Sequence, residues 1–503
     1  MKKRARAAIA GIMLLVVGAL LVWNASQRYT EHRYIAEAGA CRLDLDVVQR
    51  AGLAESAQTG SVVLLHGISA NKRIMWYLAR SFAELGLRVY VPNLPGHGRS
   101  PGPFTPEQAE GCSLSFVRGL AARGLIEPDR TLLVGHSMGG AIALRIAPIF
   151  RPAGVIAISP APMRAANGVA PENLLFHTPP PILPNTFILA GQFEHRGMAA
   201  SAEELAATGP ADSVRFLRVN HNSHVSVLFS PFVARESQAW AIRVLHLSET
   251  AALPSRGSLI GSVLGLLGIL LLSGPFLREL FGEKNAEETV SPFQPSRLRA
   301  AIECGIISLF LIYLLHYWVP LHGIHLFEGD YLASFFLLFG LLGFILHRRL
   351  AREHMRVKPG LLAAAAVGGL LLHFLVTGWF ELTASGSWLT LLRWARFPLF
   401  FLAAFAFLFV MEILAGPVLQ SRAQLPFLLG LIALVWLSLG MAVLFLHSGE
   451  ILLLLLSPYF AVCFLCISLG TQLVHRLTAS PAAAAIFGAI LLAGFCLVLF
   501  PLS

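Results

Sequence analysis

Two hydrophobic patterns divide the chain. Over residues 24–257 the apolar runs are five to eight residues long, and they alternate with amphipathic stretches and with turns containing Gly and Pro. Short buried strands that alternate with helices are typical of an α/β domain with a mostly parallel sheet. From residue 258 onward the apolar runs approach the length of about 20 residues that a helix needs to cross a bilayer.

The first pattern predicts individual elements. The short apolar runs predict strands at Ser61–Leu65, Arg88–Pro92, Thr131–Gly135, Gly154–Ser159, Thr186–Ala190 and Val214–Val219. The stretches between them predict helices at Ile74–Leu85, Met138–Ala147, Ala199–Ala207 and Pro231–Leu247. The fold class we expect for this part is therefore α/β.

The second pattern predicts membrane spans. Nine long apolar runs lie near residues 7–23, 258–275, 300–320, 330–347, 359–379, 397–417, 425–447, 451–472 and 481–501. The first run follows basic residues, and no small-x-small cleavage site comes after it, which favours an uncleaved anchor over a signal peptide. We therefore expect an N-terminal transmembrane anchor at 1–25, an α/β domain at 26–250 and an all-helical polytopic membrane domain of eight spans at 251–503.

Basic residues mark alternate loops between these spans. Loops 321–329 and 448–450 contain no Lys or Arg, and only loop 380–396, with Arg393 and Arg396, departs from the alternation. The loops on the other side carry Arg278, Lys284, Arg297 and Arg299, five basic residues in 347–358, Arg422 and Arg476. Because basic loops stay in the cytoplasm, we expect a cytoplasmic N-terminus. The α/β domain and the C-terminus would then lie across the plasma or inner membrane.

Composition agrees with a membrane protein. The chain is 56% hydrophobic and 13% charged, whereas soluble domains average about 25% charged residues. Its net charge of +10 comes from clusters beside apolar runs and not from a patch with interleaved aromatics. We therefore expect the lipid bilayer as a partner and no nucleic acid, and the sequence names no protein partner.

The six cysteines fall into two groups. Cys41 and Cys112 are the two that lie outside the predicted spans. They are candidates for a disulfide if the α/β domain is extracytoplasmic, although the sequence does not show that they meet. Cys463 and Cys466 form a C-x-x-C in an apolar run with no second ligand pair, so small buried hydrophobes are favoured over a metal or redox site.

The stretch "TLLVGHSMGGAIAL" contains the first candidate for chemistry. Gly135 to Gly139 form a G-x-S-x-G between a predicted strand and a predicted helix. In such a sharp turn the serine hydroxyl projects above the sheet, and the flanking glycines remove a clash. We predict Ser137 as a nucleophile, with a glycine-rich packing turn as the alternative.

Two further stretches, "VVLLHGISA" and "YVPNLPGHGRS", accompany this motif. Together with G-x-S-x-G they resemble the α/β-hydrolase family, in its branch of lipases, esterases and serine aminopeptidases, of which monoacylglycerol lipases are members. The resemblance covers roughly residues 60–247. It implies an α/β-hydrolase fold, an oxyanion hole made by the backbone N–H groups of Ile68 and Met138, and a structural role for His66.

In this family the chain order is serine, acid, histidine. His221 and His224 both follow the last predicted strand, and His224, at the start of the final helix, is preferred as the base. Glu194 follows the strand before that, where the family usually has aspartate. We predict Glu194 as the acid, because a glutamate can also orient an imidazole. Asp212 is the alternative, but it precedes its strand.

The segment of about 25 residues before "TFILAG" is short and proline-rich, which predicts a small or open cap. Ionisable residues also lie in or beside the spans: Glu303, Glu412, His316, His373, His322, His325, Glu328, Asp330 and Glu381. Helix-end and interhelical hydrogen bonding is favoured for them over a proton or ion path.

These observations predict a membrane-embedded serine hydrolase that cleaves a carboxylic ester, of a lipid or other amphiphile, through an acyl-enzyme. No cofactor and no metal is expected. One alternative is a peptidase or acyltransferase with the same triad. Another, from a different class, is a transporter, channel or sensor whose hydrolase-like domain only binds a ligand.

Overall fold

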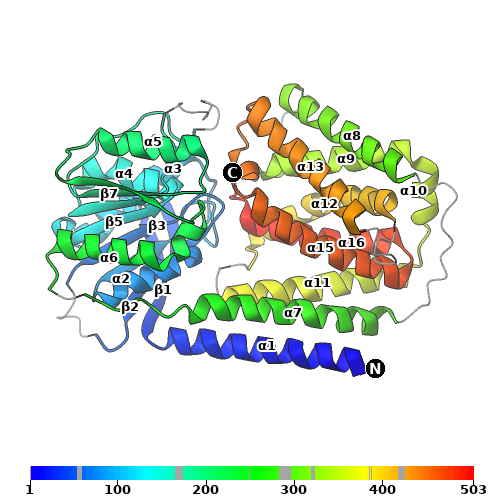
Figure 1. The fold of residues 1–503 in the computed structure, drawn as a ribbon, viewed down its shortest axis with the longest axis horizontal. Coiled ribbons are helices and arrows are strands. Elements are labelled where there is room, and N and C mark those ends of the chain that lie inside the picture. Colours follow the sequence, from blue (N-terminus) through cyan, green and yellow to red (C-terminus); the bar gives the residue numbers. More distant parts are fainter. Residues whose placement is uncertain are drawn as a thin grey trace. The chain divides into compact units, whose positions relative to one another are not determined.

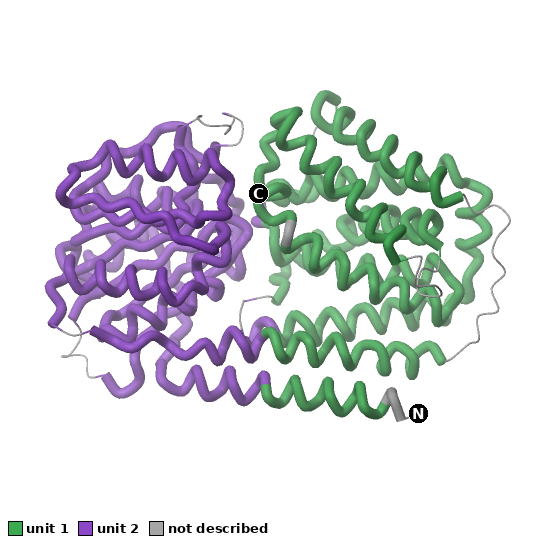
Figure 2. Tube along the Cα trace, in the orientation of Figure 1, with its two compact units in different colours: residues 1–17, 263–379, 388–500 green, residues 18–262, 380–387, 501–503 purple. Residues whose placement is uncertain are grey.

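The computed structural model describes residues 2–53, 59–164, 171, 174–248, 250–282, 296–318, 323–383, 386, 388–416 and 425–503 (Figure 1). Lys284, His322 and Arg422 lie outside these described residues. The chain forms two compact units (Figure 2). The sheet unit comprises residues 18–262, 380–387 and 501–503, and the helical unit comprises residues 1–17, 263–379 and 388–500. The predicted boundaries after residues 25 and 250 stay predictions.

The sheet unit is built on an eight-stranded sheet in the order β1-β2-β4-β3-β5-β6-β7-β8. Its strands are β1 (Tyr29–Ala38), β2 (Cys41–Arg50), β3 (Ser61–Leu65), β4 (Arg88–Pro92), β5 (Thr131–His136), β6 (Gly154–Ile158), β7 (Thr186–Gly191) and β8 (Val214–Val219). The hairpin β1–β2 is antiparallel to the rest, and β3 to β8 are parallel. The six strands predicted from sequence are these parallel ones, which are mostly buried on both faces.

Helices cover both faces of the sheet (Figure 1). They are α2 (Trp76–Glu84), α3 (Pro106–Ala122), α4 (Met138–Phe150), α5 (Arg196–Ala207) and α6 (Pro231–Leu245). On one face, Phe82 of α2 and Trp240 of α6 share a buried core with Val62 and Phe187 of the sheet. This core fixes the parallel strands, so the loops at their carboxyl ends start from fixed points.

The sequence prediction missed three elements of this unit. Half of the residues of β1 are exposed, and β2 buries Asp44 and Asp46, so neither strand shows a clean apolar alternation. Helix α3 has an explicit start signal. The Thr105 side chain accepts a hydrogen bond from the Gln108 N–H at 3.1 Å, and Pro106 occupies the first turn.

The helical unit and its flanks supply nine helices that are long and apolar enough to span a bilayer, counted over the described residues. They are α1 (Lys2–Ser26), α7 (Gly257–Phe281), α8 (Arg297–Tyr317), α9 (Gly329–Leu346), α11 (Pro359–Thr383), α12 (Leu391–Ala415), α13 (Leu425–Phe445), α15 (Ser457–Thr478) and α16 (Pro481–Leu499). The shorter α10 (Arg348–His354) and α14 (Ile451–Leu455) lie between them. By their length and composition, these helices suggest a multi-pass membrane protein.

The predicted span at 451–472 differs from the structure. The apolar run there forms two helices, α14 and α15, and the spanning stretch is Tyr459–Thr478. A proline lies in the first turn of α15. Because proline has no N–H to donate, it is tolerated there but ends a helix that reaches it from the preceding side. The hydrophobic run alone does not reveal this break.

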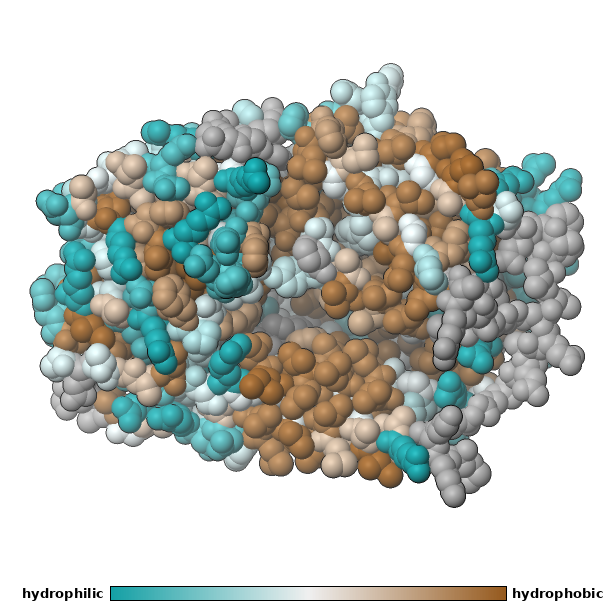
Figure 3. Space-filling model, in the orientation of Figure 1, coloured by the Kyte–Doolittle hydropathy of each residue, from teal (hydrophilic) through white to brown (hydrophobic). Residues whose placement is uncertain are grey.

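Apolar side chains cover much of the outer surface of the helices (Figure 3). On α8, for example, Ile302, Ile306 and Phe310 are each more than half exposed and recur every four residues. Such a stripe is unfavourable in water and suits contact with lipid tails.

Cys41 and Cys112 form a disulfide, with their Cα atoms 5.8 Å apart. It joins the start of β2 to α3, so the antiparallel hairpin at the edge of the sheet is covalently tied to a helix. The sequence had left this pairing open.

We expect the double variant Cys41→Ala, Cys112→Ala to unfold at a lower temperature than the unmodified protein in detergent. The cross-link closes a loop over a sequence separation of 71 residues, which in the chain-entropy model stabilises the fold by about 4 kcal/mol. Reductant should lower the unfolding midpoint of the natural protein and leave that of the variant unchanged. Cys463→Ala, at a free cysteine, is the control. A reductant effect of equal size in both proteins would contradict the assignment.

Candidate active site

Ser137 lies at the sharp turn between β5 and α4. Its φ of 53° is in the left-handed region, which a residue with a side chain adopts only when its surroundings hold it there. A Cβ atom on Gly135 would lie 2.1 Å from the Gly139 carbonyl oxygen, and one on Gly139 would lie 2.3 Å from that of Leu65. Both positions therefore require glycine, and the close approach of strand and helix explains the G-x-S-x-G spacing.

His224 lies on the loop after β8 and faces Ser137. Its Nε2 is 2.9 Å from Ser137 Oγ, and its Nδ1 is in hydrogen-bond contact with Glu194 Oε1. A carboxylate only accepts, so Nδ1 carries the proton and Nε2 is left to accept from the serine hydroxyl. The second carboxylate oxygen of Glu194 accepts from the Gly191 N–H at 3.2 Å. All three side chains are largely buried, and their hydrogen bonds form one continuous chain.

The two alternative residues lie elsewhere. His221 is exposed, and its backbone N–H donates to the Gln192 side chain at 2.9 Å. Asp212 is exposed in the turn that precedes β8, at the opposite end of that strand from His224. The structure therefore brings together Ser137, Glu194 and His224, and it leaves the alternatives outside this cluster.

The loop after β3 passes beside the serine. His66 Nδ1–H donates to the Gly67 carbonyl at 2.7 Å, and His66 Nε2 accepts from the Leu94 N–H at 3.0 Å. Both ring nitrogens are used by the neutral imidazole, and burial lowers the pKa of His66 to about 4. His66 thus joins this loop to the one after β4. Ile68, a predicted oxyanion donor, follows directly, and Met138, the other, begins α4; their role as donors stays a prediction.

Comparisons with known proteins agree with this architecture. Residues 62–297 match the Alpha/beta hydrolase family. The sheet unit has the α/β-hydrolase fold, with a mostly parallel sheet. Lipase LipV of Mycobacterium tuberculosis is 36% identical over 103 residues, which are 20% of this chain and 35% of that lipase. The match therefore spans about a third of the curated relative.

Two solved hydrolase structures are similar to part of this chain. The lidless serine hydrolase XC6422 of Xanthomonas campestris is 18% identical and covers 44% of this chain and 97% of its own, with a TM-score of 0.34. A thermophilic esterase of Thermogutta terrifontis is also 18% identical and covers 43% of this chain and 99% of its own, with a TM-score of 0.33.

A buried ionic cluster lies beside the loop that follows β3. Lys72, 2% exposed, places Nζ 2.8 Å from Asp44 Oδ1 and 2.7 Å from Asp46 Oδ1. The Asn93 side chain accepts from the Lys72 backbone N–H at 2.7 Å and donates to Asp44 at 2.9 Å. Burial lowers the pKa of the Lys72 ammonium, and the two carboxylates oppose that shift. The alternating "LDLD" of β2 is the only sequence signal for this cluster.

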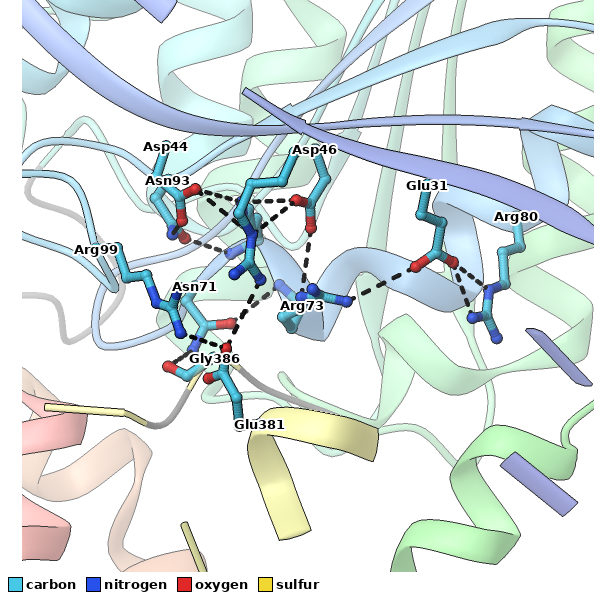
Figure 4. Close-up of polar contacts among 12 residues, drawn as sticks. Glu31, Asp44, Asp46, Asn71, Arg73, Arg80, Asn93, Arg99, Glu381 and Gly386 are labelled. Carbon is cyan, nitrogen blue, oxygen red and sulfur yellow. Dashed lines mark hydrogen bonds and ion pairs between the residues drawn. The ribbon is translucent and has the colours of Figure 1, made fainter. Parts of the chain in front are cut away.

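Further polar contacts hold the loops that follow β3 and β4. Arg99, in the "GHGRS" stretch, donates to Glu381 at 2.8 Å, and the Asn71 side chain donates to the Gly386 carbonyl at 3.3 Å (Figure 4). Both partners belong to the segment 380–387 of the sheet unit. Leu502, in the segment 501–503 of the same unit, donates its backbone N–H to the Gly96 carbonyl at 3.0 Å. Two distant stretches of chain therefore contact the loops that follow β3 and β4.

The segment between β6 and β7 has no helical lid in its described part. Residues 165–170 and 172–173 lie outside the description, and the rest of 159–185 contains no α-helix or strand. Among the residues that the structure describes, no group of three His, Cys, Asp or Glu side chains is arranged to hold a metal ion.

We expect Gly135→Ala to destabilise the sheet unit by about 3 kcal/mol or more, because its Cβ would overlap backbone atoms that cannot move independently. The unfolding midpoint in detergent measures this. Gly111→Ala is the matched control. Gly111 lies exposed on α3 with nothing within 4 Å of an added Cβ, so this change should stabilise by about 0.5–1 kcal/mol. Equal midpoints for both variants would refute the packing argument.

Proposed function

We propose that the sheet unit is a serine hydrolase that cleaves carboxylic esters through an acyl-enzyme. The observation that carries the proposal is the 2.9 Å contact between Ser137 Oγ and His224 Nε2, with Glu194 on the other face of the imidazole. A serine hydroxyl is a weak nucleophile at neutral pH, and a base within hydrogen-bond reach activates it.

The first half of the reaction acylates the enzyme. Ser137 Oγ attacks the ester carbonyl carbon, and its proton passes to His224 Nε2. The carbonyl oxygen becomes an oxyanion, which the N–H groups of Ile68 and Met138 stabilise. Glu194 stabilises the imidazolium and keeps its own charge. The intermediate then expels the alkoxide, which takes the proton from His224 and leaves as the alcohol.

The second half releases the acid. Water gives a proton to His224 Nε2 and adds to the acyl carbon, and the tetrahedral intermediate expels Ser137 Oγ, which recovers the proton. The products are a carboxylic acid and the free enzyme. Every proton in this cycle stays on the substrate, water, Ser137 or His224, so the chain needs no cofactor for it.

We further propose that the substrate is a lipid or another amphiphilic ester at the membrane surface. The strands of the sheet unit lie between α1, which ends at Ser26, and α7, which begins at Gly257, so apolar helices flank them in the sequence. The described part of the β6–β7 segment carries no helical lid. A lipase is the relative that matches over 103 residues.

The location we propose is the extracytoplasmic side of a cell membrane. The positive-inside pattern of the loops favours it. The Cys41–Cys112 disulfide supports it independently, because disulfides persist in oxidising compartments and are rare in the cytosol.

A fluorophosphonate probe tests the serine mechanism. We expect it to label the natural protein and not Ser137→Ala. His224→Gln and Glu194→Gln should each lower kcat by about 10³–10⁴-fold. The matched controls, His221→Gln and Asp212→Asn, change exposed residues and should leave kcat within about twofold. A folded natural protein that is neither labelled nor active would sink the proposal in favour of a ligand-binding role.

Chain length of the substrate tests the lipid proposal separately. We expect kcat/KM for a long-chain acylglycerol in mixed micelles to exceed that for a short soluble ester by at least about tenfold, because burying each CH₂ group contributes about 0.8 kcal/mol. A matched long-chain amide distinguishes an esterase from a peptidase. Equal values for the two esters would remove the lipid substrate and leave the serine mechanism intact.

A further inference from the structure

His136, the last residue of β5, touches the site without being one of its predicted members. It is buried, and its Nε2 lies 2.7 Å from the backbone carbonyl oxygen of His224. A carbonyl only accepts, so His136 Nε2 carries the proton and donates it. This bond joins residues 88 positions apart in the sequence, and it fixes the backbone of the residue whose side chain faces Ser137.

The same imidazole also packs against the loop after β3. A Cβ atom on Gly67 would lie 3.0 Å from His136 Nδ1 and 3.0 Å from Ser137 Cβ. The His136 and His224 rings are 4.9 Å apart between centroids. His136 directly precedes Ser137 in the sequence. Its side chain contacts the loop that carries Ile68 and holds the loop that carries His224.

The Nδ1 nitrogen of His136 makes no hydrogen bond among the described residues, so the bond from Nε2 must explain why this position is a histidine. Nδ1 is buried and has no hydrogen-bond partner among the described residues, whereas His66 uses both of its nitrogens. Burial lowers the pKa of His136 to about 3, so the ring stays neutral. An unpartnered buried nitrogen costs stability, and an apolar side chain would fill the space without that cost. The single bond to His224 is what the imidazole gains.

We propose that His136 is a positioning residue, whose Nε2–H holds the His224 backbone so that the catalytic imidazole faces Ser137. This inference rests on the proposed function. Glu194 holds the His224 side chain from one side, and His136 holds its main chain from the other. A displacement of about 1 Å in such a base costs on the order of 100-fold in rate.

Two variants separate the hydrogen bond from the bulk of the side chain. His136→Met has similar reach and no donor, and His136→Gln keeps an N–H donor at similar reach. For the Met variant we expect kcat, and the rate of fluorophosphonate labelling, to fall about 100-fold with KM within about threefold, because positioning affects the transition state more than binding. For the Gln variant we expect recovery to within about tenfold of the natural protein.

Val134→Ala is the control for general loosening of β5. Val134 is buried in the core two residues earlier on the same strand, so this change should lower the unfolding midpoint and leave kcat unchanged. Should His136→Met not fold, His136→Phe serves as the variant without a donor. The inference is overturned if the variant without a donor keeps the natural kcat, if Gln loses as much as Met, or if Val134→Ala loses as much.

Labelling of the natural protein separates this inference from the proposed function. If the natural protein reacts with the probe at Ser137 and His136→Met reacts as fast, the serine mechanism holds and the positioning role is wrong. If the natural protein does not react at all, the proposed function fails, and the positioning role fails with it.

Discussion

The backbone of Ser137 is the constraint on which the site depends. Its left-handed φ of 53° reverses the chain within one residue, which costs on the order of 1–3 kcal/mol and persists only where the surroundings over-determine it. Here β5 pairs with β3 and β6, and α4 starts directly after the serine. Because Gly135 and Gly139 let strand and helix approach so closely, the serine has no freedom to relax. His224 and Glu194 come to this fixed point on the loops that follow β8 and β7.

Those loops have no regular secondary structure, so hydrogen bonds or ion pairs outside the sheet must hold each of them in place. Two neutral imidazoles supply some of them: His66 joins the loop after β3 to the loop after β4, and His136 holds the loop of His224. A neutral ring does this without burying a charge. The cluster of Lys72, Asp44 and Asp46 does it with charges, which are favourable only while every partner is present. Loss of one partner would leave a buried charge without compensation and would lower the free energy of unfolding by about 3–5 kcal/mol.

The sequence predicts features that depend on local patterns, and it does not predict contacts between residues far apart along the chain. The parallel strands are predictable because strands buried on both faces read as continuous apolar runs. The sharp turn at Ser137 is predictable because Gly135 and Gly139 lie only two residues away from it in the sequence. The burial of Asp44 in β2 is not, because it depends on Lys72, far along the chain, and the Cys41–Cys112 pairing depends on a contact across 71 residues. The catalytic roles of Ser137, Glu194 and His224 remain predictions with a geometry that suits them.

The order of the helices gives an independent argument about topology. Four helix ends lie in or directly beside segments of the sheet unit: the end of α1, the start of α7, the end of α11 within 380–387 and the end of α16 before 501–503. A chain that crosses a membrane at each of the nine apolar helices in turn places these four ends on one side. Removing or adding a single span between α7 and α16 would put the segment around Glu381 or the one around Leu502 on the wrong side of the lipid. Arg99 contacts Glu381, and Gly96 contacts Leu502, so each pair must lie on one side of the membrane. A count of nine spans meets this requirement.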